Sequence, residues 1–212
     1  MPALPRLYVL AGVNGAGKSS IGGAAFRAFG ADYYNPDEAA RQMMAEDSGL
    51  NQTNANARTW QLGKRLLERA IAEKLDFAFE STLGANTMPR LLREAADKGV
   101  LVNIWYAGLS SPELHIARVR SRVRKGGHDI AEADIRRRYQ NSRLNLIHLL
   151  PHLAALRVYD NSAEADPSDG KPPDPILVLN MRRGKILNAK DLHHTPEWAK
   201  SIVAAALELR LR

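Results

Sequence analysis

A short glycine-rich segment near the N-terminus places the strongest constraint on how this chain can fold. Residues 12–19 read GVNGAGKS and fit the pattern G-x-x-x-x-G-K-[ST]. The segment follows the apolar run Leu7–Leu10, which suits a strand buried on both faces, and it opens a predicted helix over about residues 18–29. Backbone N–H groups in such a turn, together with the N-terminus of the helix, converge on phosphate oxygens. The spacing therefore predicts a phosphate-binding loop (P-loop) that takes a nucleoside triphosphate.

The residues of this loop have separate expected tasks. Lys18 would reach the β- and γ-phosphates, and the Ser19 hydroxyl would bind Mg²⁺. The residues predicted to contact the nucleotide are Gly12, Asn14, Gly15, Ala16, Gly17, Lys18, Ser19 and Ser20.

Strand-like and helix-like segments alternate along most of the chain, which is typical of an α/β fold with a mainly parallel sheet. Apolar runs at 77–79, 100–106 and 157–159 indicate further strands, whereas residues 51–56 look like a polar loop. We predict one domain over residues 1–212, with a helical lid at about 118–138 and a C-terminal β-hairpin followed by a helix. The predicted helices cover about 36–47, 57–75, 87–98, 112–125, 132–150 and 196–211.

Most of the excess positive charge lies in one segment. The net charge is +7, and nine basic residues stand against three acidic ones between positions 118 and 143. This arginine-rich segment, RVRSRVRKGGHDIAEADIRRR, is either a nucleic-acid-binding arm or a lid that neutralises a very anionic ligand. It contains no aromatic residue, so it lacks the stacking platforms typical of single-stranded nucleic-acid sites. We therefore favour the lid.

The composition excludes several classes of protein. The sequence has no cysteine, so disulfides, thiolate nucleophiles and cysteine metal sites are excluded. No apolar run approaches the roughly 20 residues that cross a bilayer, and the opening MPALPR has no signal-peptide pattern. We expect a cytoplasmic protein.

Two acidic residues follow predicted strands, on the side where the sheet faces its ligand. Asp37 is either a general base or an acidic first-turn residue that the helix dipole favours. Glu80 either orients an acceptor or the waters of the metal, or is a solvated surface residue. A kinase would give both carboxylates a task, whereas a nucleotide-gated binding module would leave them without one.

Six segments together resemble one known family. They read, in order, AGVNGAGKSS, NPDEAA, FAFESTL, RVRKGGHDIAEADIRRRY, NSRLNL and VYDNS. Over about residues 7–162 the chain resembles the zeta-toxin family of P-loop kinases, in its chromosomally encoded branch without a fused antitoxin. The first segment is shared by P-loop proteins at large, whereas FAFESTL and the GGH-to-RRRY segment are far more specific. The resemblance implies a three-layer P-loop kinase-like fold.

The resemblance also implies an activity. The best-known members of the family use ATP and Mg²⁺ to phosphorylate the 3′-hydroxyl of the sugar in UDP-N-acetylglucosamine. Related folds phosphorylate other nucleotides and dinucleotides, and this chain reads NPDE at 35–38 where the toxins usually carry an Asp-rich segment. The acceptor therefore stays open. Any antitoxin partner would be a separate chain.

Individual roles follow from the resemblance residue by residue. Lys18 and Ser19 would hold the phosphates and the metal, and Asp37 would be the catalytic base. The predicted acceptor-contacting residues are Asp37, Glu80, Thr82 and His128. For His128 the alternative is a hydrogen bond that anchors the lid. The predicted γ-phosphate arginines are Arg122, Arg137 and Arg138.

Overall fold

The computed structural model describes residues 4–18, 21–22, 33–163 and 174–209. The predicted helix after Lys18, together with Ser19 and Ser20 of the predicted nucleotide site, lies outside the described residues apart from isolated positions.

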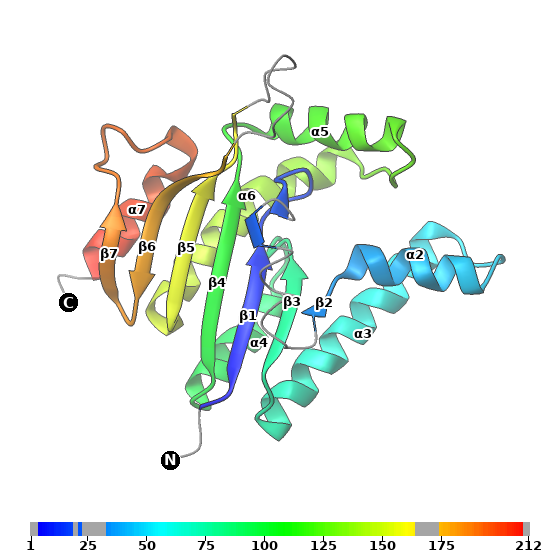
Figure 1. Cartoon of the computed structure of the whole chain (residues 1–212), viewed down its shortest axis with the longest axis horizontal. Helices are drawn as coiled ribbons and strands as arrows, with labels where there is room; N and C mark the ends of the chain where they lie inside the picture. The colour runs from blue at the N-terminus through cyan, green and yellow to red at the C-terminus, as the bar shows by residue number, and fades with distance from the viewer. Residues whose placement is uncertain (1–3, 19–20, 23–32, 164–173, 210–212) are drawn as a thin grey trace.

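One twisted sheet forms the centre of the described chain, with the strand order β2-β3-β1-β4-β5-β6-β7 (Figure 1). The first five strands along the chain are parallel, and β6 and β7 add antiparallel pairs at one edge. The mainly parallel α/β fold predicted from the sequence is thus confirmed, including the C-terminal hairpin. The strands are β1 Arg6–Ala11, β2 Tyr33–Tyr34, β3 Phe77–Ser81, β4 Leu101–Gly108, β5 Ala155–Asp160, β6 Ile176–Arg182 and β7 Lys185–Ala189.

Helices cover the sheet and surround its carboxyl edge. In Figure 1, α4, α6 and α7 lie behind the sheet, and α5 crosses above the ends of the central strands. The pair α2 and α3 lies beside β2 and β3. The helices are α2 Pro36–Glu46, α3 Gln52–Glu73, α4 Thr87–Asp97, α5 Pro112–Arg124, α6 Glu132–Leu149 and α7 Glu197–Leu209, with a 3₁₀ turn at Leu150–His152. None of the helices described is both long enough and apolar enough to span a membrane.

The main core lies between the sheet and the helices behind it. Leu7 and Val9 of β1 are fully buried and pack in one cluster with Leu146 of α6 and Ile202 of α7. Burial of the apolar strands on the helix-covered face is the chief driving force for this arrangement. It fixes β1 at the centre of the sheet, so the loop after β1 opens at the middle of the carboxyl edge.

The predicted polar loop at 51–56 is wrong, because α3 begins at Gln52. The Asn51 side chain caps this helix by accepting a hydrogen bond from the backbone N–H of Asn54, at 2.9 Å. Polar residues in a first turn are compatible with a helix when such a cap precedes them. The earlier start matters because it places Asn56 on a helix that lines the candidate site.

Candidate active site

The phosphate-binding loop follows β1 and needs glycine at its sharpest points. Gly12 has a φ of +141°, and a Cβ there would lie 2.3 Å from the carbonyl oxygen of Ala107. Gly15 has a φ of +84°, and its Cβ would lie 2.7 Å from the carbonyl oxygen of His115. Both the backbone conformation and the close approach of β4 at Gly12 and of α5 at Gly15 therefore exclude larger residues.

Three side chains hold this loop from outside. His115 Nδ1 donates to the carbonyl oxygen of Asn14 at 2.8 Å, and Asn161 Nδ2 donates to that of Ala16 at 2.9 Å. Arg138 Nη1 donates to the side-chain oxygen of Asn14 at 2.8 Å. Burial lowers the pKa of His115 to about 4, so the ring is neutral at physiological pH. A rigid loop is pre-organised for an anionic ligand.

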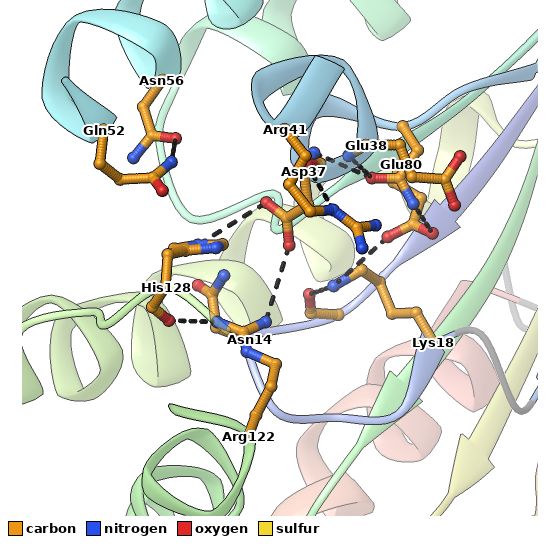
Figure 2. A network of polar contacts seen from close by, with 12 residues as sticks. Asn14, Lys18, Asp37, Glu38, Arg41, Gln52, Asn56, Glu80, Arg122 and His128 are labelled. Atoms are coloured by element: carbon orange, nitrogen blue, oxygen red, sulfur yellow. Dashed lines mark hydrogen bonds and ion pairs between the residues drawn. The ribbon is translucent and has the colours of Figure 1, made fainter. Parts of the chain in front are cut away.

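Lys18 lies where the loop meets β3. Its Nζ donates to the carbonyl oxygen of Gly12 at 3.2 Å and lies 3.8 Å from Oε2 of Glu80 (Figure 2). Both side chains are largely buried. The ammonium group is thus held at the mouth of the loop, whereas its contact with nucleotide phosphates stays a prediction.

Glu80 is the fourth residue of β3 and contacts more than Lys18. The Tyr33 hydroxyl and Asn35 Nδ2, the latter at 3.1 Å, both donate to its Oε1. These bonds connect β3 to the short strand β2 and to the start of α2. Glu80 is therefore no solvated surface residue: it ties the three elements that surround the site.

Asp37 faces the lid across the site. It lies in the first turn of α2, where the Asn35 side chain accepts hydrogen bonds from the backbone N–H groups of Asp37 and Glu38. Its carboxylate is half exposed and lies 3.6 Å from Arg122 Nη1 and 3.8 Å from His128 Nε2 (Figure 2). Both dipole-favoured placement and contact with the lid are thus present at Asp37.

The lid residues contact one another as well as Asp37. Arg122 Nη2 donates to the carbonyl oxygen of His128 at 3.1 Å. Burial lowers the pKa of His128, an effect that the nearby Asp37 carboxylate partly opposes. The Arg122 bond uses only the backbone of His128, so the lid-anchoring role considered for its side chain depends on the contact of Nε2 with Asp37.

Seven of the predicted residues line one cavity of about 350 Å³ at the carboxyl edge of the sheet: Asn14, Lys18, Asp37, Glu80, Thr82, His128 and Arg138. Its size falls within the range typical of small-molecule sites. Polar residues line one part of it: Asn14, Lys18, Asp37, Glu80, Thr82, His128, Asp134 and Arg138. A less polar wall is formed by Tyr34, Thr59, Trp60, Gly63 and Met88, with Asn56 beside it.

The three predicted lid arginines do not share one environment. Arg138 lines the cavity, and Arg122 contacts Asp37. Arg137 is not part of the cavity lining: its side chain is 62% exposed and forms an ion pair with Asp134 at 2.6 Å. Successive residues of a helix point about 100° apart, so Arg137 and Arg138 cannot both face the site from the same turn.

Two residues of α6 that sequence reasoning gave no role position the loop after β3. Ser142 Oγ donates to the carbonyl oxygen of Thr82 at 2.6 Å, and Asn145 Nδ2 donates to that of Leu83 at 2.7 Å. Ser142 is fully buried and also bonds the Tyr106 hydroxyl. Both occur in the NSRLNL segment, but only the fold brings them to β3.

Within the described ranges, no group of three or more His, Asp or Glu side chains has metal-binding geometry. His193 and His194 are adjacent in the sequence, which is poor geometry for binding one metal. His194 pairs with Asp191 at 2.8 Å. Ser19, the predicted Mg²⁺ ligand, lies outside the described residues.

The sequence matches a family model described as an AAA domain over residues 7–144, and the chain belongs to this P-loop family. An uncharacterized protein of Haemophilus influenzae is 32% identical over 132 residues, which cover 60% of this chain and 88% of the relative. The family model spans both the phosphate-binding loop and the whole lid segment at 118–138.

Solved structures share the fold at low sequence identity. A chain of the AvrRxo1-ORF1:ORF2 complex with ATP has a TM-score of 0.66 and 15% identity; the match covers 96% of this chain but only 64% of that one. A chain of the PezAT chromosomal toxin–antitoxin system of Streptococcus pneumoniae has a TM-score of 0.55 and 16% identity, with 81% and 75% coverage. A putative kinase of Chloroflexus aurantiacus has a TM-score of 0.51 and 14% identity, with 63% and 77% coverage. These neighbours define a P-loop kinase-like fold.

Proposed function

We propose that this protein is an ATP-dependent, zeta-toxin-like kinase that transfers the γ-phosphate to a hydroxyl group of a UDP-sugar such as UDP-N-acetylglucosamine. The observation that carries the proposal is that one cavity joins Lys18 of the phosphate-binding loop to the Asp37 carboxylate. A phosphate donor and a general base are then available to the same acceptor. The cytoplasm, which holds both ATP and UDP-sugars, is the proposed compartment.

The nucleotide would bind with its phosphates in the loop from Gly12 to Lys18. The backbone turn and the ammonium group of Lys18 fit an anionic triphosphate. The fold neighbour solved with ATP supports the choice of nucleotide. Mg²⁺, held through Ser19 with the Glu80 carboxylate near its waters, would neutralise charge on the phosphates.

In the transfer step, the acceptor oxygen attacks the γ-phosphorus while the bond from that phosphorus to the β–γ bridging oxygen breaks, releasing ADP. The proton of the acceptor hydroxyl passes to the Asp37 carboxylate. Lys18 and Arg138 donate hydrogen bonds to the charge that develops on the transferring group. Arg122 would act from the lid through its Nη groups, of which Nη1 lies 3.6 Å from the Asp37 carboxylate and Nη2 donates to the carbonyl oxygen of His128.

The acceptor would extend away from the phosphates along the wall formed by α3. Trp60 lines the cavity yet is 41% exposed, and Asn56 presents its side-chain amide one turn earlier on the same helix. A flat ring and an amide suit an acceptor with both an apolar face and polar edges. The exposure of Trp60 beside the cavity favours a contact with the acceptor.

We also propose a separate antitoxin protein as a partner. Two fold neighbours come from structures of paired proteins: the AvrRxo1-ORF1:ORF2 complex and the PezAT toxin–antitoxin system. Co-purification of the product of a neighbouring gene that lowers the kinase rate would support this partner. An unchanged kinase rate in the presence of the product of each neighbouring gene would contradict it.

A product assay tests the proposed function. The protein is incubated with [γ-³²P]ATP, Mg²⁺ and a panel of UDP-sugars, nucleotides and dinucleotides, and the labelled product is identified. We expect a labelled UDP-sugar. Labelling of a nucleotide or dinucleotide would keep the kinase and replace the acceptor, whereas ATP hydrolysis without transfer to any acceptor would contradict the kinase proposal.

A further inference from the structure

A second arginine cluster lies at the amino ends of the parallel strands, the opposite end of the sheet from the phosphate-binding loop. It surrounds a separate cavity of about 240 Å³, named here the amino-end cavity, lined by Arg6, Tyr8, Leu101, Asn103, Ala154, Arg182 and Arg183. The strand register explains why these distant residues meet. Tyr8 of β1 pairs with Asn103 of β4, and Asn103 pairs on its other side with Ala155 of β5. Ala155 in turn pairs with Arg182 of β6, so the four residues form one row across the sheet.

The lining of this cavity is strongly basic. Three of its residues are arginines, and none is acidic. No ion pair joins Arg182 or Arg183 to an acidic side chain in the part of the chain that the structure describes. A hydrogen bond with Tyr8 raises the pKa of Arg6, with a smaller contribution from the Asp76 carboxylate beside it, so Arg6 stays cationic but is partly balanced by that acid. Like charges brought together in this way repel one another, and a bound anion would relieve the repulsion.

The conformation of Arg183 is a second, independent observation. The hairpin between β6 and β7 has a two-residue loop, in which Arg183 has a φ of +48° and Gly184 a φ of +71°. This pair of left-handed residues is typical of a type I′ turn, for which Asn-Gly or Gly-Gly is strongly preferred. The left-handed backbone conformation disfavours arginine at this position. Its presence there is explained if the side chain contributes to ligand binding.

The turn is also held in a fixed position against the sheet. The backbone N–H of Arg183 donates to the carbonyl oxygen of Ala154 at 2.9 Å, and Ala154 itself lines the amino-end cavity. The strained residue is thus tied to the wall of the cavity rather than left at a free loop tip.

We propose that the amino-end cavity binds the phosphate or diphosphate group of a small anionic molecule. Arginine guanidinium groups bind phosphate oxygens through paired hydrogen bonds, and Arg6 of β1 would enclose such a group together with Arg182 and Arg183 of the β6–β7 hairpin. The site lies away from the carboxyl edge where Asp37 and Lys18 meet. It therefore constitutes a second anion site, and its existence does not depend on the kinase activity proposed above.

The test uses inorganic pyrophosphate as the probe and isothermal titration calorimetry in about 0.15 M salt, where nonspecific surface attraction is screened. The full-length chain with Lys18→Ala weakens the phosphate-binding loop and isolates the second site. We expect this variant to bind one pyrophosphate, and addition of R182Q and R183N to weaken that binding about tenfold or more. Arg93→Gln, which removes an exposed arginine on α4, should leave the affinity unchanged.

Two results would overturn the proposal: loss of all pyrophosphate binding in Lys18→Ala, or unchanged affinity after the R182Q and R183N substitutions. Binding of a short DNA or RNA that pyrophosphate does not displace would also overturn it, in favour of a nucleic-acid surface. Arg183→Asn alone keeps the test valid should the combined variant unfold, because asparagine is a preferred residue of this turn.

Discussion

The two arginine clusters of this molecule differ in how their charge is balanced. In the lid, arginines are matched by acids: Arg120 pairs with Glu132, Arg136 with Glu113 and Arg137 with Asp134. In the amino-end cavity, Arg182 and Arg183 have no such partner among the described residues. The sequence draws attention to the lid because of its number of arginines, yet many of these serve as structural ion pairs.

Within the lid, the contrast extends to single residues. Arg122 and Arg138 reach the site, whereas Arg137, the direct neighbour of Arg138, pairs with Asp134 at the surface. Exposed ion pairs of this kind contribute little to stability. The functional part of the lid is therefore smaller than its charge suggests.

Neutralising one arginine at a time would separate the two groups within the lid. We expect Arg138→Gln to lower kcat about 10³-fold or more, because Arg138 holds Asn14, lines the cavity and, in the proposed mechanism, would donate to the transferring phosphate. The matched variant Arg137→Gln should stay within about twofold of wild type. Single-turnover phosphoryl transfer measures both rates; equal losses in the two variants would contradict the difference in roles.

His115, the buried side chain that bonds the phosphate-binding loop at Asn14, should make the stability of the protein depend on pH. The pKa of His115 is lowered to about 4 in the folded state, while the unfolded value is near 6.5. Its contribution to the free energy of unfolding is therefore complete above about pH 6.5 and is lost as the pH falls towards 4. The expected loss is about 3 kcal/mol.

Urea unfolding between pH 4 and 7 measures this loss, and His115→Gln is the variant that should flatten the dependence while keeping a side-chain donor. His193→Gln, in the exposed turn that precedes α7, is the control and should keep the wild-type slope. An unchanged slope in His115→Gln would mean that other groups cause the dependence.

The acceptor wall should affect binding more than chemistry. Trp60→Ala is expected to raise KM for the acceptor about tenfold, since stacking on an aromatic side chain contributes on the order of 1–3 kcal/mol. The KM for ATP should remain close to wild type, because Trp60 lies on α3 and not in the phosphate-binding loop. Steady-state kinetics with each substrate varied in turn would distinguish this from a general loss of folding, in which both KM values or kcat change.

The smallest expected effect concerns the amino-end cavity without any ligand. Arg183→Asn should raise the Tm of the free protein by about 2 °C, because asparagine tolerates the left-handed conformation and one repelling charge is removed. Differential scanning calorimetry in a phosphate-free buffer measures the shift. A lower Tm would show that Arg183 stabilises the hairpin through contacts of its own.

The sequence predicted the parts of the fold that depend on local patterns. The apolar run before GVNGAGKS, the turn residues and the alternation of strands and helices all indicated the parallel sheet and the place of its ligand edge. The placement of Asp37 and Glu80 after successive strands correctly indicated that they would face one site.

Other features depend on distances that no local pattern contains. The bond from His115 to Asn14 joins residues 101 positions apart, and the phase of α6 decides between Arg137 and Arg138. The start of α3 was missed because a single capping side chain, Asn51, outweighs the polar composition that follows it. The predicted C-terminal hairpin turns at residues 183–184, and only the folded sheet shows that its arginines line a cavity together with Arg6.

Replacement of Asp37 by asparagine tests the central claim most directly. Asparagine keeps the shape of the side chain but cannot accept the proton, so phosphoryl transfer to the acceptor should fall by about 10²–10⁴-fold. ATP affinity, measured by titration on the same sample, should remain largely intact. Near-wild-type turnover in Asp37→Asn would contradict the assignment of Asp37 as the base, and with it the proposed mechanism of this site.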